Sequence, residues 1–280
     1  MRTAIVTDST AYIPEHIRAE LHIHMVPLNV VFGQASYQEE EELTAEQFYI
    51  KVREQDELPK TSQPAIGRFV ELFEQLGEEY DAIISIHLSS GISGTYQTAA
   101  TVAGMIENTR VYAYDSEISC AVQGFYVIEA ARMALAGKPA EDILARLDEM
   151  KQTMKAYFVV DDLHHLQRGG RLSSAQAFLG SLLQVKPVLH FENKVIVPFE
   201  KIRTRKKAMK RIVDLLGEAA ADGEPMEAVV IHANREAEAE EWRQELQAQF
   251  PRITFHTGYF GAVIGTHLGE GALGLGWYKQ

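Results

Sequence analysis

The chain has 280 residues, 46% of them apolar, which suffices for a large buried core and favours two domains. Its 27 Lys and Arg against 39 Asp and Glu give a net charge of −12, which disfavours a general role in binding nucleic acid or an anionic membrane surface. A single cysteine excludes an intrachain disulfide and a cysteine-based metal site. Residues 1–25 lack a signal-peptide layout, and no run approaches about 18 apolar residues. We therefore expect a cytoplasmic protein without stable membrane insertion.

The first half of the chain alternates predicted strands with predicted helices. Strands are expected at residues 3–7, 23–32, 81–88 and 110–114, and helices from Pro14 and at 44–55, 64–76, 95–107, 118–136 and 140–154. The acidic run Glu39–Glu42 is interpreted as a solvated loop. Strands that alternate with helices predict βαβ units, so the fold class is α/β with a largely parallel sheet flanked by helices.

The second half has a different order of elements. Strands are expected at 157–160, 186–190, 195–202, 227–232 and 253–256, and helices at 173–183, 204–218 and 236–248. Glu192-Asn193-Lys194 between two strands is a hairpin signal, and the tail 258–278 is rich in glycine and apolar residues. We place a boundary near residue 155, where a long helix pair stops. This gives an N-terminal α/β domain at 1–155 and a C-terminal α/β domain with a mixed sheet at 156–280.

The most informative stretch joins the strand at 81–88 to the helix that begins at Thr95. Its sequence is Ser89-Ser90-Gly91-Ile92-Ser93-Gly94-Thr95. A turn of small hydroxyl and glycine residues before a helix presents free backbone N–H groups and the positive end of the helix dipole. The hydroxyls add donors that rotate onto an acceptor. This loop therefore predicts a site for an anion, either a carboxylate or a phosphate.

Two further polar clusters follow predicted strands, at Asp8-Ser9-Thr10 and at Asp115-Ser116. A parallel sheet would place both on one rim with the 89–95 loop, at the edge where open α/β sheets bind ligands. We interpret Asp8 and Asp115 as cap and turn residues. For the pair Thr61-Ser62, an ordinary helix cap and a ligand-binding role both remain open, because nothing in the spacing shows that Thr61 meets Ser93.

Cationic residues and one histidine complete the candidates. Arg168 and Arg171 flank a Gly-Gly turn and either hold an anion or pin a domain junction by ion pairs. One predicted helix carries a basic face of Arg203, Lys206, Lys207 and Lys210, for which a solvated surface is the default and docking of an acidic partner the alternative. His267 lies in the glycine-rich Gly265-Thr266-His267-Leu268-Gly269, where we favour a functional role.

Taken together, the motifs resemble the DegV family, the fatty-acid-binding proteins that serve bacterial fatty-acid kinases. The resemblance rests on Thr7-Asp8-Ser9, Lys60-Thr61-Ser62-Gln63-Pro64, Ser89 to Thr95, Asp115-Ser116, Leu166-Gln167-Arg168-Gly169-Gly170-Arg171-Leu172-Ser173 and Gly265-Thr266-His267, in order across nearly the whole chain. The sequence departs from the family pattern at Gly269-Glu270-Gly271, where Gly-Pro-Gly is usual. Glu270 puts a charge near the expected mouth of the site.

The resemblance implies two α/β domains with one long acyl chain in a buried tunnel. Ser93 and Thr61 would hydrogen-bond the carboxyl group, with Ser62, Gly94 and Thr95 in the same loops and His267 in support. Arg168, Arg171 and Arg203 would lie near the exposed end or at a kinase-docking surface. A separate ATP-binding kinase subunit would phosphorylate the fatty acid, and the acyl phosphate would feed phospholipid synthesis. The chain itself would be a carrier without catalytic residues, metal or cofactor. The apolar runs 177–179 and 259–264 are candidates for the tunnel wall, although core packing is the better interpretation of each.

The principal alternative is an esterase or acyl hydrolase. Gly91-Ile92-Ser93-Gly94-Thr95 lies between a strand and a helix as a nucleophile elbow does, and the order Ser, Asp, His is met by Ser93, Asp161 or Asp162, and His267. Thr95 stands where that motif requires glycine. A phosphate-binding enzyme or an independent small-molecule kinase is a third option, but the chain has no G-x-x-x-x-G-K-[S/T] loop.

Overall fold

The computed structural model describes residues 2–55, 57–173 and 186–280. Apart from Ser173, the predicted helix at 173–183 falls outside the described residues, as does the apolar run 177–179. Within the described ranges, none of the helices is long and apolar enough to cross a membrane.

A four-stranded parallel sheet forms the centre of the first half, in the order β2-β1-β6-β7. Its strands are β1 (Thr3–Asp8), β2 (Ile23–Val26), β6 (Ala82–His87) and β7 (Arg110–Asp115). Helices cover both faces: α3 (Ile66–Gly77) and α4 (Thr95–Ala103) on one, α5 (Cys120–Leu135) and α6 (Ala140–Thr153) on the other. The predicted α/β class with a largely parallel sheet is confirmed.

Each face of this sheet is buried because its strands direct apolar residues to both sides. Phe69 and Phe73 of α3 pack on Ile83, which points to one side of β6. Tyr126 of α5 packs with Ile84 on the other side. Successive residues of a strand point to opposite faces, so a continuous apolar run is what a sheet covered on both sides requires.

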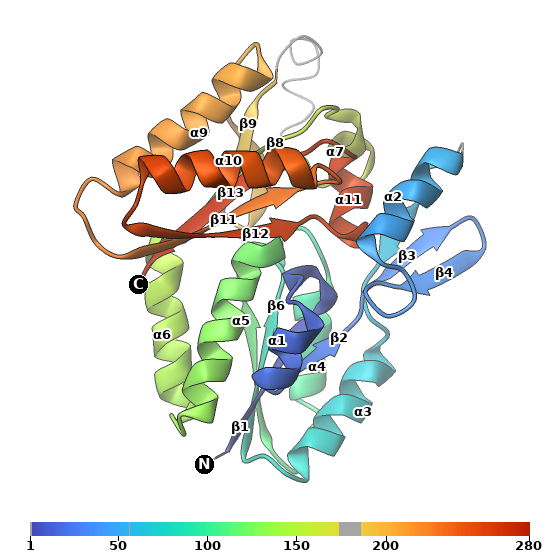
Figure 1. Cartoon of the computed structure of the whole chain (residues 1–280). Helices are drawn as coiled ribbons and strands as arrows, with labels where there is room; N and C mark the ends of the chain where they lie inside the picture. The colour runs from blue at the N-terminus through green and yellow to red at the C-terminus, as the bar shows by residue number, and fades with distance from the viewer. Residues whose placement is uncertain (1, 56, 174–185) are drawn as a thin grey trace.

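The second half contains a six-stranded mixed sheet in the order β10-β9-β8-β13-β11-β12. Its strands are β8 (Lys155–Val159), β9 (Val188–Glu192), β10 (Val195–Glu200), β11 (Met226–His232), β12 (Ile253–Tyr259) and β13 (Leu273–Lys279). Only β11 and β12 pair in parallel. Helices α9 (Arg205–Ala219) and α10 (Glu236–Gln249) pack on its outer face, and the inner face shares one apolar core with the first half. Figure 1 shows these two layers one above the other.

Several shorter elements lie outside the two large sheets. They are the 3-10 helix η1 (Ser9–Ala11), α1 (Glu15–Glu20), α2 (Ala45–Glu54), α7 (His164–Arg168), α11 (Ala262–Leu268) and a three-stranded sheet of β3 (Asn29–Phe32), β4 (Ala35–Gln38) and β5 (Lys60–Ser62). The sequence did not predict β4, β5 or α7, and it assigned no element to the tail that contains α11 and β13.

Two of the sequence predictions for single elements have clear outcomes. The single strand expected at 23–32 is wrong, because the chain breaks at Pro27-Leu28 and continues as β3 in a different sheet. Proline has no N–H to donate to a continuing ladder. The hairpin is confirmed: β9 and β10 are joined by Asn193 and Lys194, both with positive φ, as a tight two-residue turn requires.

Candidate functional site

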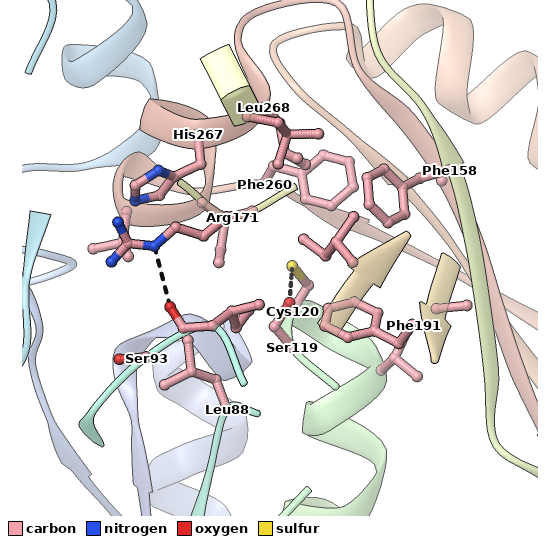
Figure 2. Close-up of a pocket in the computed structure, with 18 of the residues that line it drawn as sticks. Leu88, Ser93, Ser119, Cys120, Phe158, Arg171, Phe191, Phe260, His267 and Leu268 are labelled. Atoms are coloured by element: carbon pink, nitrogen blue, oxygen red, sulfur yellow. Dashed lines mark hydrogen bonds between the residues drawn. The ribbon is translucent and has the colours of Figure 1, made fainter. Parts of the chain in front are cut away.

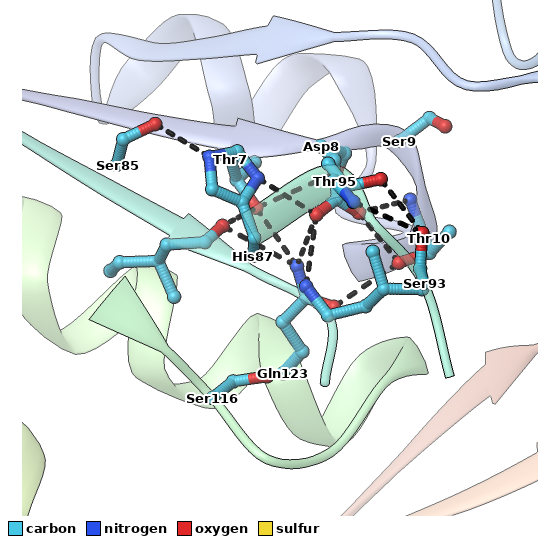
Figure 3. Close-up of polar contacts among 12 residues, drawn as sticks. Thr7, Asp8, Ser9, Thr10, Ser85, His87, Ser93, Thr95, Ser116 and Gln123 are labelled. Atoms are coloured by element: carbon cyan, nitrogen blue, oxygen red, sulfur yellow. Dashed lines mark hydrogen bonds and ion pairs between the residues drawn. The ribbon is translucent and has the colours of Figure 1, made fainter. Parts of the chain in front are cut away.

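The polar ends of three parallel strands meet at one edge of the first sheet, as the sequence predicted. Asp8 accepts hydrogen bonds from the backbone N–H of Leu88 (2.9 Å) and of Thr10 (3.0 Å). Asp115 accepts from the N–H (3.1 Å) and the hydroxyl (2.6 Å) of Ser90. Both carboxylates are therefore cap and turn residues that hold the neighbouring loops, and Figure 3 shows the contacts around Asp8.

The loop 89–95 leads from β6 into α4 and carries Ser93 at its tip. Ser93 Oγ lies 2.9 Å from Thr95 Oγ1 and accepts from the Thr95 N–H at 3.3 Å. Thr95 is fully buried and is not part of the cavity wall described below, so it supports Ser93 rather than facing a ligand. The backbone N–H of Gly94 has no protein acceptor among the described hydrogen bonds, which leaves a donor beside the Ser93 hydroxyl.

The fold brings the segment containing Thr61 against this loop, which spacing alone could not show. An added Cβ on Gly94 would collide with the side-chain oxygen of Gln63, so the Gln63 side chain lies directly against the Gly94 backbone. Gln63 Nε2 also donates to Thr98 Oγ1 of α4 at 2.8 Å. Thr61 and Ser62 belong to β5, a strand rather than a helix cap, and both line the same cavity as Ser93.

His267 of α11 holds the Thr61 side chain. Its Nε2 lies 2.8 Å from Thr61 Oγ1, whereas Nδ1 has no hydrogen-bond partner in the described part of the chain and lies against Gly169. Burial, together with the charges of Arg171 and Arg168, lowers the pKa of His267 to about 3, so the ring is neutral at pH 7. A donor at Nδ1 would be left without an acceptor. We therefore assign the proton to Nε2, which leaves the Thr61 hydroxyl hydrogen free to donate elsewhere.

The three predicted arginines differ in whether they line the cavity that contains Ser93. Arg171 lines the same cavity as Ser93 and His267; its Nε donates to the carbonyl of Ile92 (3.2 Å), and burial lowers the pKa of its guanidinium group. Arg168 lies in the last turn of α7, outside the wall of this cavity. Arg203 is exposed and is also absent from the wall. Of the three, Arg171 lines the cavity and the other two do not, so contact of Arg168 and Arg203 with a partner stays a prediction.

These polar groups form one end of a cavity of about 310 Å³ between the two halves of the molecule. We call it the acyl cavity, after the ligand that the family resemblance implies. Apart from Ser119, the rest of its wall is mainly apolar and comes from both sheets and from α5 and α11, for example Leu88, Val122, Phe158, Phe191 and Ile264. Figure 2 shows His267 and Arg171 on one side and Phe158 and Phe191 on the other. Of the run 259–264, Phe260, Val263 and Ile264 line the cavity, in agreement with their candidacy.

A buried carboxylate fixes the start of α11. Glu39 is completely buried; it accepts from the Val263 N–H (2.6 Å), from Tyr12 Oη (2.9 Å) and from Ser9 Oγ (2.6 Å). Burial raises its pKa to about 7. The interpretation of residues 39–42 as a solvated loop is therefore wrong for Glu39. Nothing in a run of four acidic residues distinguishes the one that turns inward.

Glu270, the departure from the family pattern, is held away from the cavity. It forms an ion pair with Arg53 of α2 and accepts from Asn234 Nδ2 at 2.9 Å. Gly269 and Gly271 on either side both have positive φ. The charge therefore links α2 to the end of α11 and does not enter the wall of the acyl cavity.

The hydrolase interpretation does not agree with the geometry. Asp161 forms an ion pair with Arg205 at 2.7 Å, and Asp162 contacts His164 Nδ1 at 2.7 Å. His267 is bonded to Thr61 and has no carboxylate partner among the described residues. The arrangement of base and orienting acid that activates a serine nucleophile is not assembled around Ser93.

Comparison with known proteins gives one consistent family. A family model described as "Uncharacterised protein, DegV family" matches residues 2–280. Protein DegV of Bacillus subtilis is 62% identical over 278 residues, covering 99% of both chains. The crystal structure of DegV, a fatty acid binding protein from Bacillus subtilis, superposes with a TM-score of 0.96 at 61% identity and full coverage of both chains. A fatty-acid-binding DegV family protein from Thermus thermophilus superposes with a TM-score of 0.93 at 33% identity, also with full coverage of both chains.

Proposed function

Because the chain belongs to the DegV family, we propose that it binds one long-chain fatty acid in the acyl cavity and presents the carboxyl group to a separate ATP-dependent fatty-acid kinase. The observation that carries the proposal is the composition of one cavity, with an apolar body and a polar end made by Thr61, Ser93, Arg171 and His267. Fatty-acid binding in the related structures supports it. The acyl phosphate formed by the kinase feeds phospholipid synthesis, and this chain acts as the carrier.

The two parts of the cavity have different energetic roles. Burial of a dozen or more methylene groups contributes roughly 10 kcal/mol before ordering costs are subtracted, at about 0.8 kcal/mol per group. A carboxylate that loses its water needs hydrogen bonds, or it costs several kcal/mol. The hydroxyls of Thr61 and Ser93 and the N–H of Gly94 supply those bonds, and the Arg171 guanidinium supplies a positive charge. The tail gives affinity and the polar end fixes the orientation of the carboxyl group.

The proposed division of labour follows the order of the chain. Residues 1–155 form the domain whose loops bind the carboxyl group, and residues 156–280 form the domain that covers the acyl chain. Arg168 and Arg203 are left for contact with the kinase, because neither lines the cavity. Arg203 adjoins the basic face of α9, and a cationic surface of this kind steers an acidic partner.

The test is native mass spectrometry of the protein purified from a bacterial host, followed by extraction and lipid analysis. A stoichiometric adduct of about 250–300 Da that proves to be a free fatty acid is expected for a chain with a dozen or more methylene groups. A protein that is empty, and that also fails to take up added hexadecanoic acid after delipidation, would refute the carrier function. For the kinase step, phosphate transfer from ATP to the fatty acid should require both the carrier and an ATP-binding kinase subunit.

A further inference from the structure

A second cavity adjoins the apolar end of the acyl cavity. It has a volume of about 340 Å³, and we call it the side cavity. Ala156, Tyr157 and Phe191 line both cavities, so these three residues form the partition between them. Figure 2 places Phe191 on the side of the acyl cavity away from His267 and Arg171. The side cavity therefore lies beyond the end of the acyl cavity that is remote from its polar groups.

The side cavity has a polar lining, whereas the lining of the acyl cavity is mainly apolar. Three lysines line it, and two of them are already paired: Lys151 donates to the carbonyl of Asp115 (2.8 Å) and Lys194 to its carboxylate (2.9 Å). Both also lie within 4 Å of Glu117. The third, Lys155, precedes Ala156 of the partition; its side chain is exposed, and its ammonium group has no hydrogen bond or ion pair in the described part of the chain. One positive charge is thus left available next to the partition between the cavities.

A buried hydroxyl in the same wall also lacks a partner. Tyr126 of α5 lines the side cavity and is completely buried, yet its hydroxyl makes no hydrogen bond to any described residue. Burial raises its pKa well above the usual value, so it remains a donor. Val122, four residues before Tyr126, lines the acyl cavity. Residues four apart lie on the same face of a helix. A ligand that runs along this face of α5 would reach the Tyr126 hydroxyl.

We propose that the side cavity receives the far end of the ligand, and that the protein takes long-chain acids carrying a second oxygen function there, either a carboxylate or a hydroxyl group. The inference rests on the proposed function and specifies its substrate class. A plain hydrocarbon end gains nothing beside Lys155 and leaves the Tyr126 hydroxyl unpaired. An oxygen atom at that end accepts from both groups. Phe191 belongs to the partition that such a ligand has to pass.

The test compares three ligands on the delipidated full-length protein by competition with a fluorescent fatty acid: hexadecanoic, 16-hydroxyhexadecanoic and hexadecanedioic acid. We expect the two oxygenated acids to bind within about tenfold of hexadecanoic acid, whereas a second carboxylate buried without partners would weaken binding by more than about 100-fold. Lys155→Met should weaken hexadecanedioic acid by about tenfold and leave hexadecanoic acid unchanged. Lys138→Met, an exposed lysine beyond the end of α5, is the matched control.

Tyr126→Phe separates recognition from folding. Because the hydroxyl has no partner, its removal should not lower the melting temperature, but it should weaken both oxygenated acids relative to hexadecanoic acid. If hexadecanoic acid binds and both oxygenated acids are excluded by more than about 100-fold, the side-cavity inference is wrong and the proposed function stands. The inference would also be overturned if the affinity for each oxygenated acid, relative to hexadecanoic acid, were the same in Lys155→Met, Tyr126→Phe and Lys138→Met. If hexadecanoic acid itself fails to bind, the proposed function fails.

Discussion

Thr61 Oγ1 lies 2.8 Å from His267 Nε2, although 206 residues separate the two in the sequence. The contact joins β5 in the first half of the chain to α11 in the second, at the polar end of the acyl cavity. Since the neutral imidazole donates from Nε2, the Thr61 oxygen accepts this hydrogen bond. The hydroxyl hydrogen of Thr61 is then free to point toward the cavity. We therefore expect His267 to act on a bound fatty acid through Thr61.

Thr61→Val removes this donor while keeping the shape of the side chain. We expect fatty-acid affinity to fall by about tenfold, the cost of one hydrogen bond to a charged group. Binding is measured by titration of the delipidated protein with hexadecanoic acid. The control is Thr101→Val, since Thr101 bonds within α4 and is exposed. Equal affinities for the two variants would show that Thr61 does not contact the carboxyl group.

His267 should make the protein less stable in acid. Its pKa of about 3 in the folded state lies below the ordinary value of 6.5, so the unfolded chain binds more protons as the pH falls below 6.5. Between pH 6.5 and pH 5 this difference removes about 2 kcal/mol of stability. His267→Gln keeps a donor near Thr61 and lacks the titration. Urea unfolding at pH 7 and pH 5 should show a smaller loss for the variant than for the wild type.

Glu39 has the opposite effect on stability. Its pKa of about 7 lies above the ordinary 4.5, so the folded state holds the proton more tightly and stability falls as the pH rises from 4.5 through 7. The change is about 3 kcal/mol across that window. Glu39→Gln should flatten the pH dependence of the free energy of unfolding. Its stability relative to the wild type should therefore rise between pH 5 and pH 8. Glu46→Gln, at an exposed position of α2, should keep the wild-type slope; a wild-type slope in Glu39→Gln would contradict the assignment.

Gly94 tests the close packing of the Gln63 side chain against the loop 89–95. Its φ of −80° is ordinary, so Gly94→Ala introduces no backbone strain, but the new Cβ would collide with Gln63. Because that side chain is flexible, we expect a stability cost below about 1 kcal/mol and a larger loss of fatty-acid affinity. The double variant Gln63→Ala/Gly94→Ala has room for the Cβ and should recover affinity. If the double variant binds no better than Gly94→Ala, the collision is not the cause.

The sequence was sufficient for the elements whose pattern is local. Continuous apolar runs predicted β1, β6 and β7, and the turn at Asn193-Lys194 predicted the β9–β10 hairpin. The polar residues after the parallel strands were predicted to share an edge because parallel strands end on the same side of a sheet. For Ser93 this placed a candidate side chain at the cavity without any knowledge of distant contacts.

What the sequence could not predict depends on contacts between distant segments. Thr61 and Ser62 are in a short edge strand, and three residues are too few for a periodic signal. Glu39 resembles its acidic neighbours, and only the packing of α11 decides that it is buried. Arg168 and Arg171 are three residues apart, yet the Gly-Gly turn between them sends one into the cavity and leaves the other outside its wall.

The position of β13 has a consequence for synthesis of the chain. This strand lies between β8 and β11, in the interior of the six-stranded sheet, and it contributes Gly274 and Leu275 to the cavity wall. All four strands of the parallel sheet precede β8 in the sequence. This sheet therefore has all of its strands while the ribosome is still making the second half of the chain. β8 meanwhile has one edge without its neighbour until β13 emerges. The cavity therefore becomes complete only after β13 has been made. Until then a nascent chain exposes an unpaired edge of β8, which favours aggregation or binding by a chaperone.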